Sequence, residues 1–147
     1  MWGIKTVPNA TEKPTILLVE DDENDVFLFE RELIKLMDRL RVRRVGDGVK
    51  AREYIQGLGG FADREKYPLP KAIVLDLNLP RASGLEFLDW LRSGFCEHSQ
   101  DAPVIVLSAS GLEADVRGAS HAGANAFLTK PAKWEDLLEH FQRLDIL

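Results

Sequence analysis

The 147-residue chain has the size of one globular domain, with 45% hydrophobic and 29% charged residues. Its formal net charge of −5 gives no support for a general attraction to nucleic acid or to an anionic membrane. The single cysteine cannot form an internal disulfide, and the sequence has neither a signal-peptide pattern nor an apolar run near the ~18 residues of a membrane span. We therefore expect a cytoplasmic protein that binds neither nucleic acid nor membrane.

An irregular segment, Met1 to Pro14, precedes a regular alternation of short apolar runs and helical patterns. The segment contains two prolines and no periodicity, so we expect a flexible tail over 1–14 and one domain over 15–147. The alternation is typical of repeated βα units around a parallel sheet.

The apolar runs predict five strands. The first, third and fourth runs are continuous, as expected of central strands buried on both faces, whereas the second and fifth are weaker and suit the edges. The predicted strands are 16–19, 42–45, 72–75, 104–107 and 126–128. We expect an α/β fold with a doubly wound five-stranded parallel sheet in the order 2-1-3-4-5, which is flavodoxin-like.

Helical periodicity predicts five helices between and after these strands. They are expected over 24–40, over 49–58, after Gly84, around 112–122 and from Trp134 onward. Met37 falls on the apolar stripe of the first helix, and Phe95 on that of the third. The helix around 112–122 has the weakest stripe, chiefly Leu112, Val116 and Ala119, and is expected to move most easily.

Polar side chains follow four of the five predicted strands. Glu20, Asp21 and Asp22 follow the first strand, and the third, fourth and fifth are followed by Asp76, Ser108 and Lys130. The carboxyl ends of parallel strands meet at one edge of the sheet, so these side chains are expected to converge there. Neighbouring carboxylates repel one another and favour a hard cation, which predicts a Mg²⁺ or Mn²⁺ site suited to phosphoryl chemistry. Ser108 and Lys130 would then contact the phosphoryl oxygens.

Each of these residues also has an ordinary structural explanation. Acids that follow a strand and precede a helix are common turn or N-cap residues, and a single lysine is usually a solvated one. The joint occurrence at four strand ends favours a functional site.

Four ordered segments resemble the receiver domain of bacterial two-component response regulators, and the resemblance extends over residues 14–145. The segments that carry it are 16–22, 74–80 followed by Gly84, 103–109 and 123–131. The resemblance implies that Asp76 accepts a phosphoryl group from the phosphohistidine of a kinase. It also implies an acidic pair for the metal, either Glu20 with Asp21 or Asp21 with Asp22, with the run length favouring the first pair. The backbone carbonyl of Asn78 is implied as a further metal ligand.

The same resemblance assigns three more roles. Ser108 would be the switch hydroxyl, Lys130 the lysine that neutralises the phosphoryl group, and Phe127 the switch aromatic. The Lys130–Pro131 peptide bond would be cis. The protein would then be a phosphoacceptor that promotes its own phosphorylation and slow dephosphorylation, rather than an enzyme acting on a separate substrate.

The segments 57–70 and 77–81, and the early end of the chain, resemble stand-alone receivers that serve bacterial phytochromes and related histidine kinases. The expected partners are such a kinase or a phosphotransfer protein, a downstream protein, or a second copy of the chain. One alternative is a flavodoxin-like binding module that works without phosphorylation. Another is a Mg²⁺-dependent phosphatase with an aspartyl-phosphate, which is disfavoured because Asn78 stands where an acid would be needed.

Overall fold

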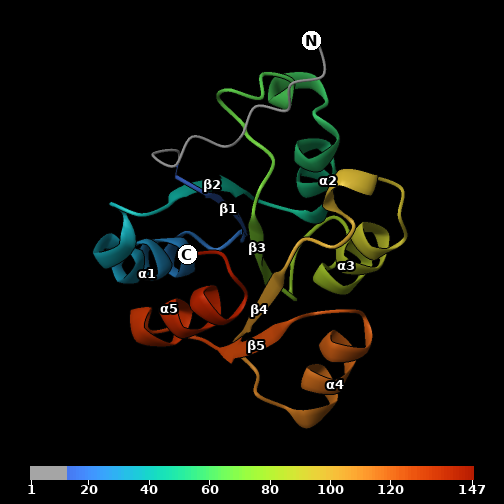
Figure 1. Ribbon diagram of the computed structural model, residues 1–147. Helices are drawn as coiled ribbons and strands as arrows, with labels where there is room; N and C mark the ends of the chain where they lie inside the picture. The colour runs from blue at the N-terminus through green and yellow to red at the C-terminus, as the bar shows by residue number, and fades with distance from the viewer. Residues whose placement is uncertain (1–12) are drawn as a thin grey trace.

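The computed structural model describes residues 13–147, so most of the tail expected over Met1 to Pro14 lies outside the described residues. Five parallel strands form one sheet in the order β2-β1-β3-β4-β5, as predicted (Figure 1). They are β1 (Thr15–Val19), β2 (Arg41–Val45), β3 (Ala72–Asp76), β4 (Val104–Ser108) and β5 (Ala126–Thr129). The α-helices are α1 (Glu23–Leu33), α2 (Gly48–Gln56), α3 (Gly84–Arg92), α4 (Glu113–His121) and α5 (Trp134–Arg143).

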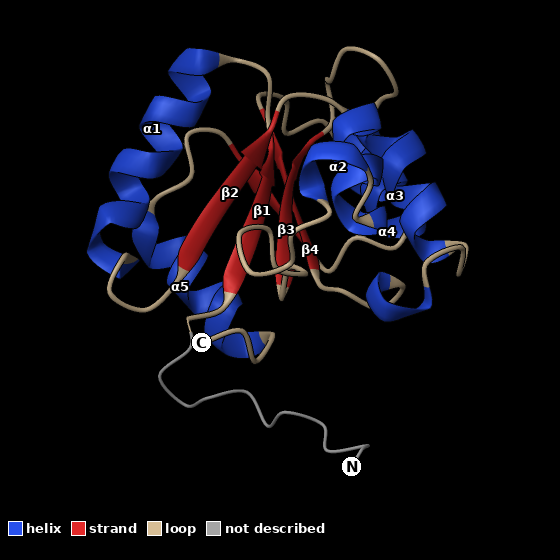
Figure 2. Ribbon diagram, turned by 90° about the horizontal axis from the view of Figure 1, so that it is seen from above, coloured by secondary structure: helices blue, strands red, loops and turns tan. Residues whose placement is uncertain are grey.

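Helices cover both faces of the sheet, with α1 and α5 on one face and α2, α3 and α4 on the other (Figure 2). All residues of β1, β3 and β4 are buried, whereas only Val45 of β2 and no residue of β5 is. This pattern follows from the central and edge positions that the apolar runs predict. Two core clusters result, one on each face of the sheet.

The first helix is shorter than predicted, because the segment 24–40 does not form one continuous helix. The α-helix ends at Leu33, and a 3-10 turn follows over Ile34–Leu36. The tighter turn changes the rotational phase of the side chains, so that Leu36 and Leu40 are buried while Met37 is 44% exposed.

Two other apolar side chains predicted to pack are exposed. Phe95 lies beyond the end of α3, after Gly94 turns the chain with a φ of 85°, and is 69% exposed. Leu112 is the N-cap residue of α4 and is 67% exposed. Within α4 itself, Ala119 is the one buried residue.

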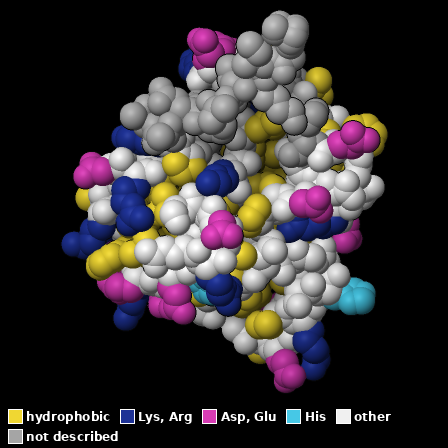
Figure 3. Space-filling model, viewed as in Figure 1, with side chains coloured by type: hydrophobic (Ala, Val, Ile, Leu, Met, Phe, Trp, Pro, Cys, Tyr) yellow, Lys and Arg dark blue, Asp and Glu magenta, His cyan; other side chains and the backbone are white. Residues whose placement is uncertain are grey.

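The surface mixes side-chain types. Phe27 and Ile34 in the α1 region are 63% and 67% exposed. Figure 3 shows hydrophobic side chains and charges of both signs interspersed over the face that it presents. No helix within residues 13–147 is both long and apolar enough to cross a membrane.

Candidate functional site

Three carboxylates meet at the carboxyl edge of the sheet. Glu20 and Asp21 follow β1, and Asp76 is the last residue of β3. These strands pair in parallel, with Val19 opposite Leu75, so the chain delivers all three acids to the same place. One carboxylate oxygen from each lies within 4.8 Å of the others. Glu20 and Asp76 are 2% and 6% exposed, so mutual repulsion is weakly screened by water.

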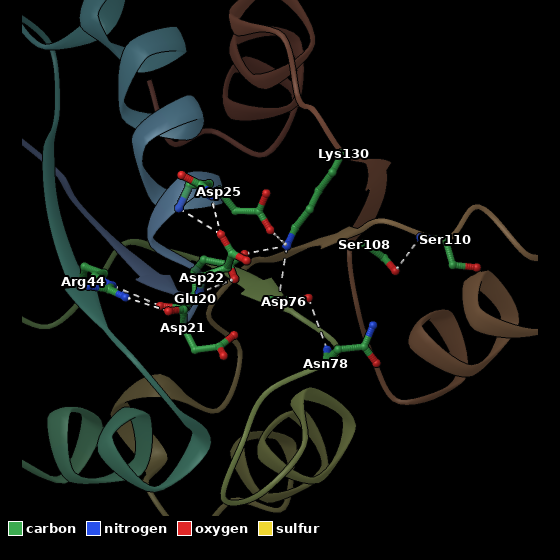
Figure 4. Close-up of polar contacts among 11 residues, drawn as sticks. Glu20, Asp21, Asp22, Asp25, Arg44, Asp76, Asn78, Ser108, Ser110 and Lys130 are labelled. Carbon is green, nitrogen blue, oxygen red and sulfur yellow. Dashed lines mark hydrogen bonds and ion pairs between the residues drawn. The ribbon is translucent and has the colours of Figure 1, made fainter.

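The side chain of Lys130 reaches into this cluster (Figure 4). Lys130 follows β5 and joins Pro131 through a cis peptide bond, as expected. Its Nζ lies 2.6 Å from Glu20 Oε2, 2.8 Å from Asp25 Oδ2 and 3.4 Å from Asp76 Oδ2. One ammonium therefore neutralises part of the charge of three carboxylates that come from three elements.

The environment shifts the pKa values of both partners in the shortest contact. Burial raises the pKa of the Glu20 carboxyl to about 7, although hydrogen bonds from Lys130 and from the Asp22 amide act against it. Burial lowers the pKa of the Lys130 ammonium, but its hydrogen bonds to Asp25 and Glu20 and the charge of Asp76 together outweigh this effect. The lysine pKa lies above its ordinary value, so Lys130 is a cation at physiological pH.

The geometry separates the acids that the sequence left as alternatives. The Asp22 side chain accepts hydrogen bonds from the amides of Asn24 and Asp25 at 2.8 and 3.0 Å, so Asp22 is the N-cap of α1. The group of acids that could hold a metal contains Glu20 and Asp21 instead. The arrangement favours this pair as ligands.

Asp25 and Arg44 also contact the site, and neither is predicted from the sequence. Asp25 lies in the first turn of α1 and binds Lys130. Arg44 in β2 donates to the backbone carbonyls of Glu20 at 3.0 Å and Asp21 at 3.2 Å, and forms a 2.7 Å ion pair with Glu23. Predicting the position of this guanidinium would have required the register of β2 against β1, in which Arg44 lies opposite Leu18.

The loop after Asp76 folds back on itself. Asp76 Oδ1 accepts a hydrogen bond from the Asn78 amide at 3.2 Å, and the Asn78 side chain is exposed. The Gly84 amide donates to the Leu77 carbonyl at 3.1 Å, which brings the start of α3 against this loop. The two Asp76 oxygens therefore have different environments, one facing a backbone amide and the other facing Lys130.

Ser108 and Phe127 lie on the neighbouring strands β4 and β5. Ser108 ends β4 and is 1% exposed, and its Oγ accepts a hydrogen bond from the Ser110 amide at 3.2 Å. The Lys130 amide donates to the Ser108 carbonyl at 2.8 Å, which ties the ends of β4 and β5 together. Phe127 is half-buried and packs against the core cluster under α2, α3 and α4.

A family model described as "Response regulator receiver domain" matches residues 16–142. The chain is 34% identical over 131 residues to the "Probable methanogenesis regulatory protein FilR2" of Methanothrix harundinacea, covering 89% of this chain and 81% of that protein. It is 32% identical over 130 residues to the response regulator Rcp1 of Synechocystis, covering 88% of this chain and 85% of Rcp1.

Solved structures show the same fold. The bacteriophytochrome response regulator AtBRR matches with a TM-score of 0.79 and 31% identity, over 92% of this chain and 95% of that one. The Mn²⁺-bound form of Rcp1 matches with a TM-score of 0.70 and 32% identity, over 90% and 91% of the two chains. A receiver domain of the sensor histidine kinase PA1611 from Pseudomonas aeruginosa, with magnesium in its active-site cleft, matches with a TM-score of 0.70 and 31% identity, over 90% and 98%.

Proposed function

The chain belongs to the response regulator receiver domain family, and from this premise we propose that it is a single-domain response regulator phosphorylated on Asp76. The observation that carries the proposal is the position of Asp76. Its carboxylate is buried at the end of β3, beside two further acids and within 3.4 Å of the Lys130 ammonium. An anionic nucleophile, a cation and a cluster of acids in one place are the parts that phosphoryl transfer requires.

We assign the metal site to Glu20, Asp21, Asp76 and the backbone carbonyl of Asn78. The donor set supports this assignment, because it offers only oxygens and its three carboxylates already lie within ligand-sharing distance of one another. A bound Mg²⁺ or Mn²⁺ would neutralise these carboxylates and orient the phosphoryl oxygens. Arg44 would keep the Glu20–Asp21 backbone in place through its hydrogen bonds to both carbonyls.

Asp76 is the proposed nucleophile. A carboxylate oxygen of Asp76 attacks the phosphorus of a phosphohistidine, an O–P bond forms, the N–P bond breaks, and the histidine nitrogen keeps the electron pair. Lys130 faces the attacked group with a full positive charge and offsets the charge that accumulates on its oxygens. Water later cleaves the acyl phosphate, so the protein is an acceptor that is regenerated slowly.

Phosphorylation would be transmitted through the ends of β4 and β5. The Ser108 hydroxyl would leave the Ser110 amide to bond a phosphoryl oxygen, and Phe127 would change its packing at the same time. The surface formed by α4, β5 and α5 is then the proposed output surface for a protein partner, because α4 is the helix held by the least burial.

We propose a histidine kinase of the phytochrome type as the phosphoryl donor. The support is the similarity to Rcp1 and to AtBRR, whose structure is described as a bacteriophytochrome response regulator, over about nine-tenths of this chain. Phosphotransfer from purified candidate kinases would test this part of the proposal.

The phosphorylation itself is tested with a small phosphodonor and Mg²⁺, followed by measurement of the intact mass. We expect wild-type protein to gain one phosphoryl group. The gain should disappear in Asp76→Asn and on chelation of the metal, and it should remain in Asp89→Asn, which removes an exposed aspartate from α3. An unchanged mass of the wild-type protein under these conditions would refute the proposal.

A further inference from the structure

Asp25 holds the Lys130 ammonium from outside the proposed metal site. Its Oδ2 lies 2.8 Å from Lys130 Nζ, against 3.4 Å for Asp76 Oδ2. Asp25 is not among the acids whose oxygens lie together as a metal-binding group. Its backbone is fixed, because it lies in the first turn of α1 and its amide is bound by the N-cap Asp22. The shorter contact therefore anchors the lysine to a helix, on the side away from Asp76 (Figure 4).

Two of the N–H donors of Lys130 form hydrogen bonds, both of them to carboxylates. An ammonium has three N–H donors, and three carboxylates surround this one. The two short contacts, to Glu20 and Asp25, are hydrogen bonds. The longer contact to Asp76 is an ion pair and is the weakest of the three. To bring the ammonium closer to Asp76, a phosphoryl group there must draw Lys130 away from these two carboxylates.

Asp25 also makes the site more negative without serving as a proposed ligand. Glu20, Asp25 and Asp76 contact a single ammonium, and Asp21 lies close to Glu20 and Asp76, so an incoming phosphoryl group, itself an anion, meets an excess of negative charge. We infer that Asp25 is a positioning residue that restrains Lys130 and thereby lowers the affinity of the site for a phosphoryl group. This inference rests on the proposed function and concerns the regulation of the same site.

Asp25 could matter to the fold in a simpler way, because acids in the first turn stabilise a helix through its dipole. A purely structural role would change stability, with no gain in the binding of an anion. The two roles therefore give different results for the same substitution.

The test compares beryllofluoride binding in the presence of Mg²⁺ with the binding of Mg²⁺ alone, for wild type and Asp25→Asn. We expect the variant to bind beryllofluoride about fivefold more tightly, which corresponds to about 1 kcal/mol, the size of one partly exposed ion pair. Its affinity for Mg²⁺ alone should stay within about twofold of wild type, because Asp25 is not a proposed ligand. Asp25→Ala should behave in the same way. It also removes any hydrogen bond that the asparagine side chain could keep with Lys130.

Glu23→Gln is the matched control. It removes one negative charge from the same helical turn, at a side chain that is 80% exposed and paired with Arg44 rather than Lys130. We expect its affinity for beryllofluoride to equal that of wild type, and an equal gain in Glu23→Gln would overturn the inference in favour of a general charge effect.

The remaining outcomes separate the inference from the proposed function. Binding of beryllofluoride by wild type with no gain in Asp25→Asn, or a loss of Mg²⁺ affinity in that variant, overturns the inference alone. Failure of the wild-type protein to bind beryllofluoride overturns the proposed function and the inference with it.

Discussion

Gly84 lets the start of α3 pack closely against the loop of the proposed phosphoacceptor, because it has no side chain. A Cβ atom added to this residue would lie 2.4 Å from the carbonyl oxygen of Asp76 and 2.8 Å from the Cα of Leu77. Both are backbone atoms, which cannot turn away as the end of a side chain can. The start of α3 can therefore approach Asp76 this closely only with glycine at this position.

A methyl group at Gly84 is expected to destabilise the fold. Gly84→Ala should lower the free energy of unfolding by roughly 1–3 kcal/mol, as overpacking commonly does, and should slow phosphorylation by displacing the Asp76 loop. Gly60→Ala, where a Cβ would meet nothing within 4 Å, should leave both properties unchanged. Denaturant unfolding of the three proteins checks the first effect, and equal midpoints for wild type and Gly84→Ala would contradict it.

The sequence predicts the positions of residues that directly follow an apolar run. It does not predict contacts that a side chain makes with another helix or strand. Asp76 and Lys130 were placed correctly at the sheet edge because strand ends determine their positions. Asp25 and Arg44 depend on the direction of a helix and on strand register, which no local pattern specifies. The assigned roles of Ser108 and Phe127 stay predictions, since they concern a movement.

The segment 57–70, which carries part of the resemblance to stand-alone receivers, is held to α2 by specific contacts. The Tyr54 hydroxyl donates to the Pro68 carbonyl at 2.8 Å, and its ring packs against Phe61 and Tyr67 with centroids 5.2 and 6.0 Å away. Arg64 donates to the Tyr54 carbonyl at 2.8 Å and so satisfies part of the end of the helix. These contacts make the segment an ordered cover for this side of the core.

The anchoring of this segment should depend on pH in the alkaline range. Burial raises the pKa of the Tyr54 phenol from 10.0 to about 12, so folding favours the neutral hydroxyl. Its contribution to stability is complete below pH 10 and is lost as the pH rises to about 12. Tyr54→Phe should be less stable than wild type near neutral pH by about 1 kcal/mol, and this deficit should shrink between these two pH values.

Urea unfolding at several pH values measures that difference. Tyr67→Phe, which removes a hydroxyl from the same aromatic cluster and keeps the ring, is the matched control. A deficit of Tyr54→Phe that is the same at every pH would contradict the assignment.

Element boundaries were less predictable than element types. The strand order followed from which runs are fully apolar, because a central strand is covered on both faces. The end of α1 at Leu33 could not be predicted in the same way, because Leu36 and Leu40 continue the helical spacing of apolar residues although a 3-10 turn replaces the α-helix there. Phe95 was misplaced for a related reason, since the turn at Gly94 outweighs the apolar spacing.

At the scale of the whole molecule, the proposed phosphorylation site lies at the edge of a sheet that separates two core clusters. One cluster packs under α1 and α5, and the other under α2, α3 and α4, with the sheet between them. Lys130 connects the site to α1 through Asp25, and Ser108 connects it to the loop before α4 through Ser110. The α4 side is the weaker attachment, because Ala119 is the one buried residue of that helix.

Hydrogen exchange with and without beryllofluoride and Mg²⁺ should therefore change mainly around the β4–α4 loop, α4 and β5, with little change in α2. Ser108→Ala should still bind beryllofluoride, but the exchange rates in α4 should no longer change. The variant lacks the hydroxyl that is proposed to link the phosphoryl group to α4. Ser110→Ala keeps its backbone amide and should respond as wild type does. A full response of α4 in Ser108→Ala would exclude the proposed route.

The sparse anchoring of α4 also matters for protein engineering. A helix held to the core through a single alanine places few packing constraints on the rest of its residues. Its outer residues, among them Arg117 and Glu113, which pair with each other at 3.0 Å, can be exchanged without disturbing the acids and the lysine at the sheet edge. The proposed output surface could thus be redesigned on this helix while the proposed phosphorylation site at Asp76 is kept intact.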